Sequence, residues 1–245
     1  IKLLLLNKFD VHFFSAGNFS YLNETHLYKQ LGVYVHYNRY PYLYESLEKM
    51  LRVNNMYFDY IFLSRHDICY NNKEYVRKYC PRTKLIYITH DIAHRRLNFP
   101  ESEKIKKYEI DNINYCDMSL IVSTEEVEYL KDYVPDEKIF YYPICYEKVD
   151  RSIRSNITDT RDIYFIGSSH YPNIEAINNF LLNIWPIIVK LDSNINLHVI
   201  GQCGNNITST FKNVIIHGLI SEEKLFNLLN NFRVNIVPLL NGGGI

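Results

Sequence analysis

The stretch DIYFIGSSHYPN at residues 162–173 decides the fold. Its apolar run at residues 163–166 predicts a short buried strand, and Gly167 ends that strand. A long helix is predicted at residues 173–191, with Trp185 on its buried side. A buried strand followed directly by a helix is one unit of a parallel sheet that helices cover.

The same alternation continues to the end of the chain. Three further strands are predicted, at residues 196–200, 214–217 and 234–237. Residues 221–231 predict a helix, because they open on Ser221 and two glutamates in the manner of a capped helix. The glycines that follow these three strands are Gly201, Gly218 and the triplet Gly242, Gly243 and Gly244.

The first half of the chain shows a second alternation. Strands are predicted at residues 11–14, 33–36, 60–63, 84–88 and 118–122. Helices are predicted at residues 24–31, 42–52, 72–79, 102–114 and 124–133. The polar residues 146–160 interrupt the alternation and are interpreted as a linker. We therefore predict an α/β chain of two Rossmann-like domains, residues 1–145 and 161–245, with parallel sheets covered by helices on both faces.

The composition is that of an ordinary globular chain. Of its 245 residues, 47% are hydrophobic and 22% are charged, which excludes a disordered chain and a small disulfide scaffold. The 27 Lys and Arg balance the 27 Asp and Glu, so the net charge gives no support for binding to nucleic acid. No run approaches the ~20 apolar residues of a membrane span. We predict no transmembrane segment, although peripheral contact with a membrane stays open.

The cysteines predict the compartment and argue against a metal site. Five cysteines lie far apart, without a CxxC pair or a cluster with histidine. They are Cys69, Cys80, Cys116, Cys145 and Cys203. Their spacing does not suit zinc, and an odd number cannot form a complete set of disulfides. A reduced, cytoplasmic setting and the absence of a bound metal are therefore predicted.

The placement of the glycines in the second half indicates a ligand site. Open α/β sheets bind ligands beyond the carboxyl ends of their strands, where glycine lets the backbone approach a phosphate. The alternative is that each glycine only forms a tight turn. The sequence contains neither GxGxxG nor GxxxxGK[ST], which disfavours a dinucleotide-dependent dehydrogenase and a P-loop NTPase.

The order of several motifs resembles the group-1 (GT4-like) glycosyltransferases of the GT-B fold. The second half contains HYPN at residues 170–173, WP at residues 185–186 and VPLLNGGGI at residues 237–245. The first half contains IYITHD at residues 86–91 and CDMSLIVSTEE at residues 116–126. These motifs are similar to the donor-side and acceptor-side domains of that family, respectively.

The resemblance implies a GT-B fold with a cleft between two domains. It implies transfer of a sugar from a nucleotide-sugar donor to an unknown glycan, lipid-linked or protein acceptor. The reaction of this family usually proceeds with retention and without a bound metal. The nucleotide-sugar is a substrate, so no cofactor is expected.

The resemblance also implies roles for individual residues. His90 and Asp91 are expected at the catalytic site, with a plain helix-start cap as the alternative. Residues expected to bind the donor are Gly167, Ser168, Ser169, His170, Gly201, His217, Gly218, Gly242, Gly243 and Gly244. Residues expected on the acceptor side are Arg65, His66 and Arg95. Loop capping by Asn173 or Ser169, strand packing by His217 and a solvated basic surface around Arg95 stay open as alternatives.

Compared with the family, the chain is expected to be truncated at both ends. The first strand of the family would precede residues 1–6, which correspond to the tail of its first helix. A basic residue and an acidic motif that hold the donor would follow Ile245. Two other interpretations stay open. One is a nucleotide-sugar epimerase of the same fold, and the other is a fragment that binds a nucleotide-sugar without catalysis.

Overall fold

The computed structural model describes residues 1–15, 22–36, 46–54, 57–96, 100–144, 161–207, 210–229 and 231–240. The chain divides into two compact units, with the division between Ile144 and Cys145. Each unit has its own parallel sheet and its own hydrophobic core. The predicted linker, residues 146–160, lies outside the described residues.

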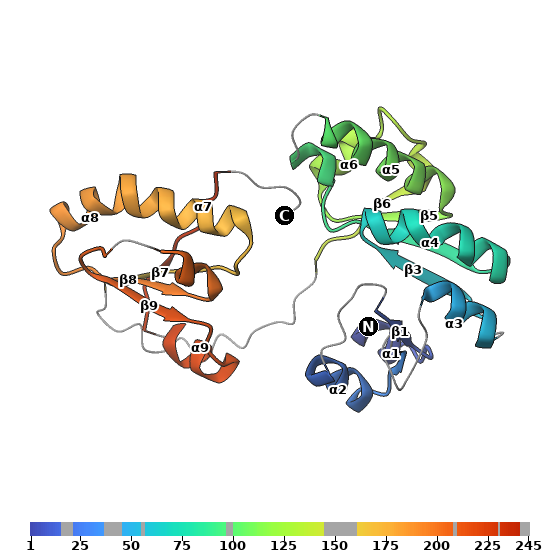
Figure 1. The fold of residues 1–245 in the computed structure, drawn as a ribbon, viewed down its shortest axis with the longest axis horizontal. Coiled ribbons are helices and arrows are strands. Elements are labelled where there is room, and N and C mark those ends of the chain that lie inside the picture. Colours follow the sequence, from blue (N-terminus) through green and yellow to red (C-terminus); the bar gives the residue numbers. More distant parts are fainter. Residues whose placement is uncertain are drawn as a thin grey trace. The chain divides into compact units, whose positions relative to one another are not determined.

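The first unit contains two parallel sheets (Figure 1). The larger sheet has the order β3-β4-β5-β6, with β3 at Tyr60–Ser64, β4 at Lys84–Ile88, β5 at Met118–Ile121 and β6 at Ile139–Tyr141. The smaller sheet pairs β1 (His12–Phe14) with β2 (Tyr34–His36), in the register His12 opposite Tyr34.

Helices follow the strands of the first unit in the predicted order. The α-helices are α1 (Lys2–Leu6), α2 (Leu22–Gln30), α3 (Leu47–Asn54), α4 (His66–Tyr79), α5 (Glu101–Tyr115) and α6 (Thr124–Leu130). Two short 3-10 helices are η1 (Ala93–Arg96) and η2 (Asp136–Lys138). The strand at residues 84–88 is confirmed to the residue, whereas β6 was not predicted and α4 begins six residues before the predicted helix at 72–79.

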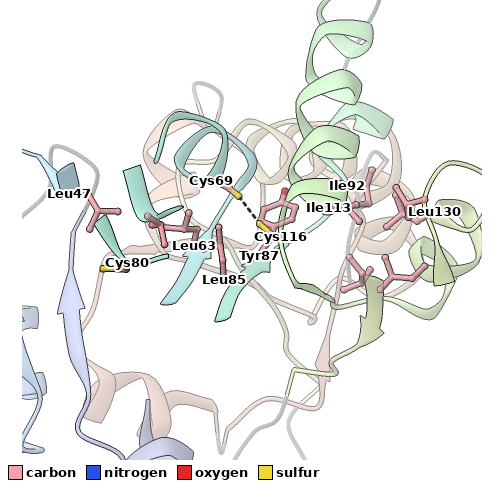
Figure 2. Packing of buried hydrophobic residues seen from close by; sticks show 14 of the residues in the cluster. Leu47, Leu63, Cys69, Cys80, Leu85, Tyr87, Ile92, Ile113, Cys116 and Leu130 are labelled. Carbon is pink, nitrogen blue, oxygen red and sulfur yellow. Dashed lines mark hydrogen bonds between the residues drawn. The ribbon is translucent and has the colours of Figure 1, made fainter. Parts of the chain in front are cut away.

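The core of the first unit lies between the larger sheet and its helices. Leu85 and Tyr87 of β4 are fully buried, and Ile86 between them is only 7% exposed, so both faces of this strand are covered. Figure 2 shows Leu85 and Tyr87 beside Leu63 of β3 and Ile113 of α5. Uninterrupted burial of this kind explains why the sequence of β4 is a continuous apolar run.

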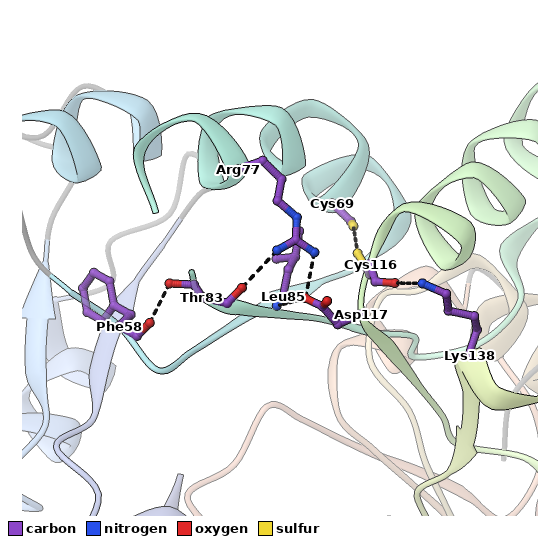
Figure 3. A network of polar contacts seen from close by, with 8 residues as sticks. All are labelled: Phe58, Cys69, Arg77, Thr83, Leu85, Cys116, Asp117 and Lys138. Carbon is purple, nitrogen blue, oxygen red and sulfur yellow. Dashed lines mark hydrogen bonds and ion pairs between the residues drawn. The ribbon is translucent and has the colours of Figure 1, made fainter. Parts of the chain in front are cut away.

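A polar network ties α4 to the amino ends of two strands (Figure 3). Arg77 donates to the carbonyl of Thr83 at 3.0 Å and to the carboxylate of Asp117 at 2.7 Å. Asp117 also accepts from the backbone N–H of Leu85 at 2.7 Å. Burial alone raises the pKa of the Asp117 carboxyl, but the Leu85 N–H and the Arg77 guanidinium outweigh burial, so this pKa lies below its ordinary value.

The second unit contains a four-stranded parallel sheet in the order β10-β7-β8-β9. Its strands are β7 (Ile163–Ile166), β8 (Leu197–Ile200), β9 (Val214–Gly218) and β10 (Val234–Asn235). The chain therefore pairs three successive strands and then returns to the other side of the first, as in Rossmann-like sheets. This order and the flanking helices confirm the predicted α/β class.

One long helical run leads from β7 into the second unit. It consists of α7 (Tyr171–Asn179), a π-helical turn η4 (Phe180–Ile184) and α8 (Trp185–Leu191). Pro186 lies in the first turn of α8 and has no N–H to donate, which accounts for the wider turn before it. In Figure 1 this run lies along one face of the sheet, and α9 (Glu222–Leu229) lies on the other side. The 3-10 helix η5 (Gln202–Asn206) follows β8.

The core of the second unit is built on this helical run. Trp185 is 1% exposed, and its indole N–H donates to the carbonyl of Lys212 at 2.8 Å, which confirms the predicted packing role. By length and composition the run Tyr171–Leu191, with a mean hydropathy of 1.2, could cross a membrane. Within that run, Ile177 and Leu181 are fully buried in the core cluster of the unit.

The two predicted helix caps differ in the structure. Ser221 accepts from the backbone N–H of Lys224 at 3.3 Å, so it caps α9 as predicted. Ser123 occupies the cap position of α6, but its side chain makes no capping hydrogen bond. Glu126 in the first turn of α6 is buried, and its carboxylate accepts from the N–H of Ile92 instead.

Candidate functional site

In the first unit, predicted site residues gather at the carboxyl ends of β3 and β4. Because these strands are parallel neighbours in the register Ser64 opposite Ile88, the loops that follow them lie at one edge of the sheet. The hydroxyl of Ser64 lies 2.7 Å from Nε2 of His90. Ser64 was not predicted as a site residue. The signal that could have found it is its position at the end of the strand next to the one that carries His90.

Arg65 has a strained backbone at this edge. Its φ of 77° and ψ of 148° lie in a region that a residue with a side chain rarely adopts. Its N–H donates to the carbonyl of Ile88 at 3.1 Å, which holds the start of α4 against β4. The guanidinium is exposed, with Nε 3.6 Å from a carboxylate oxygen of Asp67. Backbone strain concentrates at functional sites, and here it occurs at the end of β3, beside the strand that leads to His90.

His66 and Arg95 occupy different places in the unit. His66 is half-buried at the start of α4, and its carbonyl accepts from the side-chain amide of Asn112 at 2.9 Å. Arg95 is exposed on η1, and its guanidinium lies 4.9 Å from the ring centroid of Tyr129 on α6. The structure therefore brings Arg65 and His90 to one edge, while Arg95 contacts α6.

His90 and Asp91 form the tip of the loop after β4. Thr89 before them is buried, and both its N–H and its hydroxyl donate to the carbonyl of Leu120, at 3.0 and 3.2 Å. His90 is exposed and Asp91 is half-buried. After the tip, the N–H of Ile92 donates to the carboxylate of Glu126, and the N–H of Ala93 donates to that of Glu109. Capping at this point therefore comes from carboxylates on two other helices.

In the second unit, two predicted glycines lie against each other. A Cβ on Gly201, whose φ is 97°, would lie 2.2 Å from the carbonyl oxygen of Gly167. The N–H of Gly167 donates to the carbonyl of Ile200 at 3.0 Å, and that of Gly201 donates to the carbonyl of Gly218 at 2.7 Å. These N–H groups thus continue the pairing of the sheet. Close approach to the backbone of Gly167 explains glycine at position 201, whereas a Cβ on Gly167 would meet the side chains of Phe165, Asn173 and Cys203 at 2.9–3.0 Å. A donor-binding role for the three glycines stays a prediction.

The loop after β7 presents exposed polar side chains. Ser168 accepts from the N–H of His170 at 3.3 Å and from the amide of Asn173 at 3.2 Å. These contacts order the loop, but α7 has no side-chain capping bond at its N-cap His170, so the predicted capping by Asn173 or Ser169 is not formed there. Ser169 donates to the side chain of Gln202 at 3.2 Å and so joins the loops after β7 and β8. His170 is exposed at the start of α7.

His217 is a packed strand residue, as one of the two sequence interpretations expected. Its Nε2 lies 2.8 Å from Nδ1 of His198, and the two rings are stacked with centroids 5.1 Å apart. His198 in turn lies 3.3 Å from the carboxylate of Asp162. Burial lowers the pKa of His217, and the neighbouring His198 lowers it further. A role for His217 in donor binding stays a prediction.

Other expected features are placed as follows. Gly242, Gly243 and Gly244 lie outside the described residues. Among the residues that are described, no group of three or more His, Cys, Asp or Glu could hold a metal ion. A shallow hollow of about 280 Å³ on the second unit is lined by other residues. These are Ser221, Glu223, Lys224, Asn227, Leu228 and Asn231.

The comparisons with known proteins identify the fold. No family model matches the sequence, and no curated protein matches it. Among solved structures, TarM is similar with a TM-score of 0.60 at 13% identity, over 78% of this chain and 39% of TarM. Anabaena Alr3699/HepE in complex with UDP and glucose is similar with a TM-score of 0.64 at 12% identity, over 91% of this chain and 65% of HepE.

A third similar structure is a trehalose-6-phosphate synthase, with a TM-score of 0.50 at 11% identity, over 91% of this chain and 62% of the synthase. The chain thus spans less than two thirds of each of these three proteins. All three are GT-B glycosyltransferases, so the similarity shows that the chain has the α/β fold of that class. Membership of the group-1 family within this class stays a prediction.

Proposed function

We propose that this chain is the sugar-transferring region of a glycosyltransferase that uses a nucleotide-sugar donor. The observation that carries the proposal is the similarity to HepE, whose structure contains UDP and glucose and matches 91% of this chain. The ordered motifs of the sequence support the same class. The acceptor, whether glycan, lipid-linked or protein, is left open.

The chemistry of the reaction supports roles for the exposed residues at the sheet edges. Negative charge develops on the nucleoside diphosphate as it leaves, so the site needs cations and hydrogen-bond donors that are fixed in advance. His90 and Arg65 supply such groups in the first unit. In the second unit, the Ser168 hydroxyl accepts in both of its loop contacts and keeps its proton to donate, while the Ser169 hydroxyl donates to Gln202 and keeps a lone pair to accept. We infer that His90, held by Ser64, contacts the sugar or its phosphate.

Two finer features of the proposal concern the reaction course. We propose retention of the anomeric configuration, because the study of the similar trehalose-6-phosphate synthase concerns glycosyltransfer with retention. We also propose that no metal is required, in keeping with the family resemblance. A cytoplasmic location is proposed on the basis of the cysteine pattern, in which the described cysteines Cys69, Cys80, Cys116 and Cys203 are all buried thiols outside disulfides.

Titration calorimetry with UDP-, GDP- and dTDP-sugars tests the proposal. We expect the chain to bind one of these donors and to release the nucleoside diphosphate slowly. The substitution His90→Ala should reduce turnover by about 100-fold, as loss of a positioned acid-base or hydrogen-bonding group does. The matched control His26→Ala changes an exposed histidine on α2 and should leave turnover unchanged.

Four results would contradict the proposal or its finer features. Failure to bind any of the donors would overturn the proposed function. Conversion of the donor to an isomer without an acceptor would instead identify an epimerase. Loss of activity in EDTA, with recovery on addition of a divalent ion, would overturn metal independence. Inversion at the anomeric carbon, seen by proton NMR of the product, would overturn retention.

A further inference from the structure

Two buried carboxylates anchor the segment that follows His90 and Asp91. Glu109 of α5 is fully buried, and its Oε1 accepts from the N–H of Ala93 at 2.8 Å. Glu126 of α6 is 3% exposed and accepts from the N–H of Ile92 at 2.8 Å. Because a buried carboxylate is costly unless it is hydrogen-bonded, these contacts fix both the carboxylates and the backbone that they hold.

A buried histidine extends the anchor made by Glu109. Oε2 of Glu109 lies 2.6 Å from Nδ1 of His94 and 3.2 Å from the N–H of the same residue. On the other side of the ring, Nε2 of His94 lies 2.7 Å from the hydroxyl of Tyr129. An ionised carboxylate only accepts, so Nδ1 of His94 donates to Glu109, while Nε2 and the Tyr129 hydroxyl share a hydrogen bond on the other side of the ring. The orientation of the His94 ring is thereby fixed.

The loop tip is therefore held on both sides. Before it, Thr89 makes two hydrogen bonds to the carbonyl of Leu120 on β5. After it, the backbone from Ile92 onward is held by α5 and α6. Only His90 and Asp91 lie between these two anchors. His90 belongs to this two-residue segment, and its Nε2 lies 2.7 Å from the hydroxyl of Ser64.

We propose that Glu109, acting through His94 and the backbone of η1, is a positioning residue that holds the His90 imidazole against Ser64. The inference deepens the proposed function and rests on it only where it concerns catalysis. Glu109 itself is fully buried and acts through the loop. A misplacement of about 1 Å at a reacting group can cost about 100-fold in rate, so an anchor of this kind matters for turnover.

The test begins with a readout that does not need a substrate. The imidazole nitrogens of His90, assigned with the help of His90→Ala, report its tautomer and its bond to Ser64 by two-dimensional nitrogen–proton NMR. We expect Glu109→Gln to shift these signals. The control Glu103→Gln changes an exposed glutamate on the same helix and should leave them unchanged. Tyr129→Phe removes only the hydroxyl that bonds Nε2 of His94, so it should shift the His90 signals less. This variant replaces Glu109→Gln in the test if Glu109→Gln does not fold.

The kinetic test is a double-mutant cycle with Ser64→Ala. We expect Glu109→Gln to lower kcat by about 10- to 100-fold while the KM for the donor stays nearly unchanged. If both residues act through His90, the two substitutions together should cost little more than the larger single effect. A purely structural role would instead make the two effects multiply, because each would act on its own.

The outcomes separate this inference from the proposed function. Unchanged His90 signals in folded Glu109→Gln and Tyr129→Phe would overturn the positioning role, whatever the melting temperatures. Multiplying effects in the cycle would overturn it as well. If the wild-type chain binds no nucleotide-sugar, the proposed function fails. The NMR comparison then still decides whether Glu109 positions His90.

Discussion

The contact between Gly201 and Gly167 makes a quantitative prediction for the substitution Gly201→Ala. The new Cβ would lie 2.2 Å from the carbonyl oxygen of Gly167, well inside the 3.0 Å that real Cβ atoms keep. That carbonyl also accepts from the N–H of Cys203 at 3.2 Å, so it cannot withdraw without disturbing the loop after β8. With φ of 97° and ψ of −179°, the backbone of Gly201 lies in a region that is essentially restricted to glycine, so we expect a loss of about 1–3 kcal/mol for the backbone and a further 1–3 kcal/mol for the overlap, roughly 2–6 kcal/mol in all.

Gly218→Ala is the matched control in the same unit. Gly218 also has a positive φ, of 63°, but its new Cβ would meet only Asn205 Oδ1 at an ordinary distance of 3.8 Å. This variant should therefore lose only the contribution of the backbone, about 1–2 kcal/mol. The larger loss expected for Gly201→Ala reflects the steric overlap together with the more restricted backbone of Gly201.

Urea unfolding followed by tryptophan fluorescence measures both variants. Trp185 is the single tryptophan of the chain and lies in the core of the second unit, so its emission reports that unit. We expect the unfolding midpoint of Gly201→Ala to lie clearly below that of Gly218→Ala, with similar slopes. Equal midpoints would refute the reasoning that backbone contact, rather than φ alone, requires glycine at this position.

Three further predictions concern stability. Asp117→Asn should destabilise the first unit most above pH 3.8, and the difference from wild type in thermal melts should close as the pH falls, because the lowered pKa of Asp117 stabilises the fold only while the carboxyl is ionised. The second unit should lose stability as the pH falls below 6.5, since burial and His198 lower the pKa of His217 and protonation favours the unfolded chain. His217→Gln should weaken this dependence in Trp185 fluorescence. Trp185→Phe should cost about 1–3 kcal/mol in thermal melts followed by circular dichroism, because it removes packed volume and the indole hydrogen bond.

The sequence predicted elements best where a strand buries an apolar face. β4 is covered on both faces and β7 buries Ile163 and Phe165 on one face, and the limits of both strands were predicted to the residue. β6 was missed because it has only three residues, of which Phe140 and Tyr141 are exposed. The start of α4 was missed because Arg65 at its cap provides no capping side chain, so the usual signal was absent.

The candidate site was only partly predictable, for a related reason. The apolar run at residues 84–88 predicted a strand, and this placed His90 just after the end of that strand. Its bond to Ser64 depends on which strands are neighbours, which is a tertiary property. Glu109 stands four residues from Ile113 on the buried side of α5, so a helical pattern could have placed it on the apolar face. Its partners on η1 could not be deduced, since they depend on how α5 packs.

The buried thiols of the cysteines allow the opening of each unit to be followed separately by chemical labelling. Three fully or nearly buried thiols, Cys69, Cys80 and Cys116, belong to the core of the first unit, while Cys203 belongs to that of the second. An alkylating reagent reaches such thiols only when the surrounding structure opens, so labelling rates measure local opening equilibria. In a chain with Cys145→Ser, the site of modification would show which unit opens first, and whether a bound nucleotide-sugar protects one unit or both.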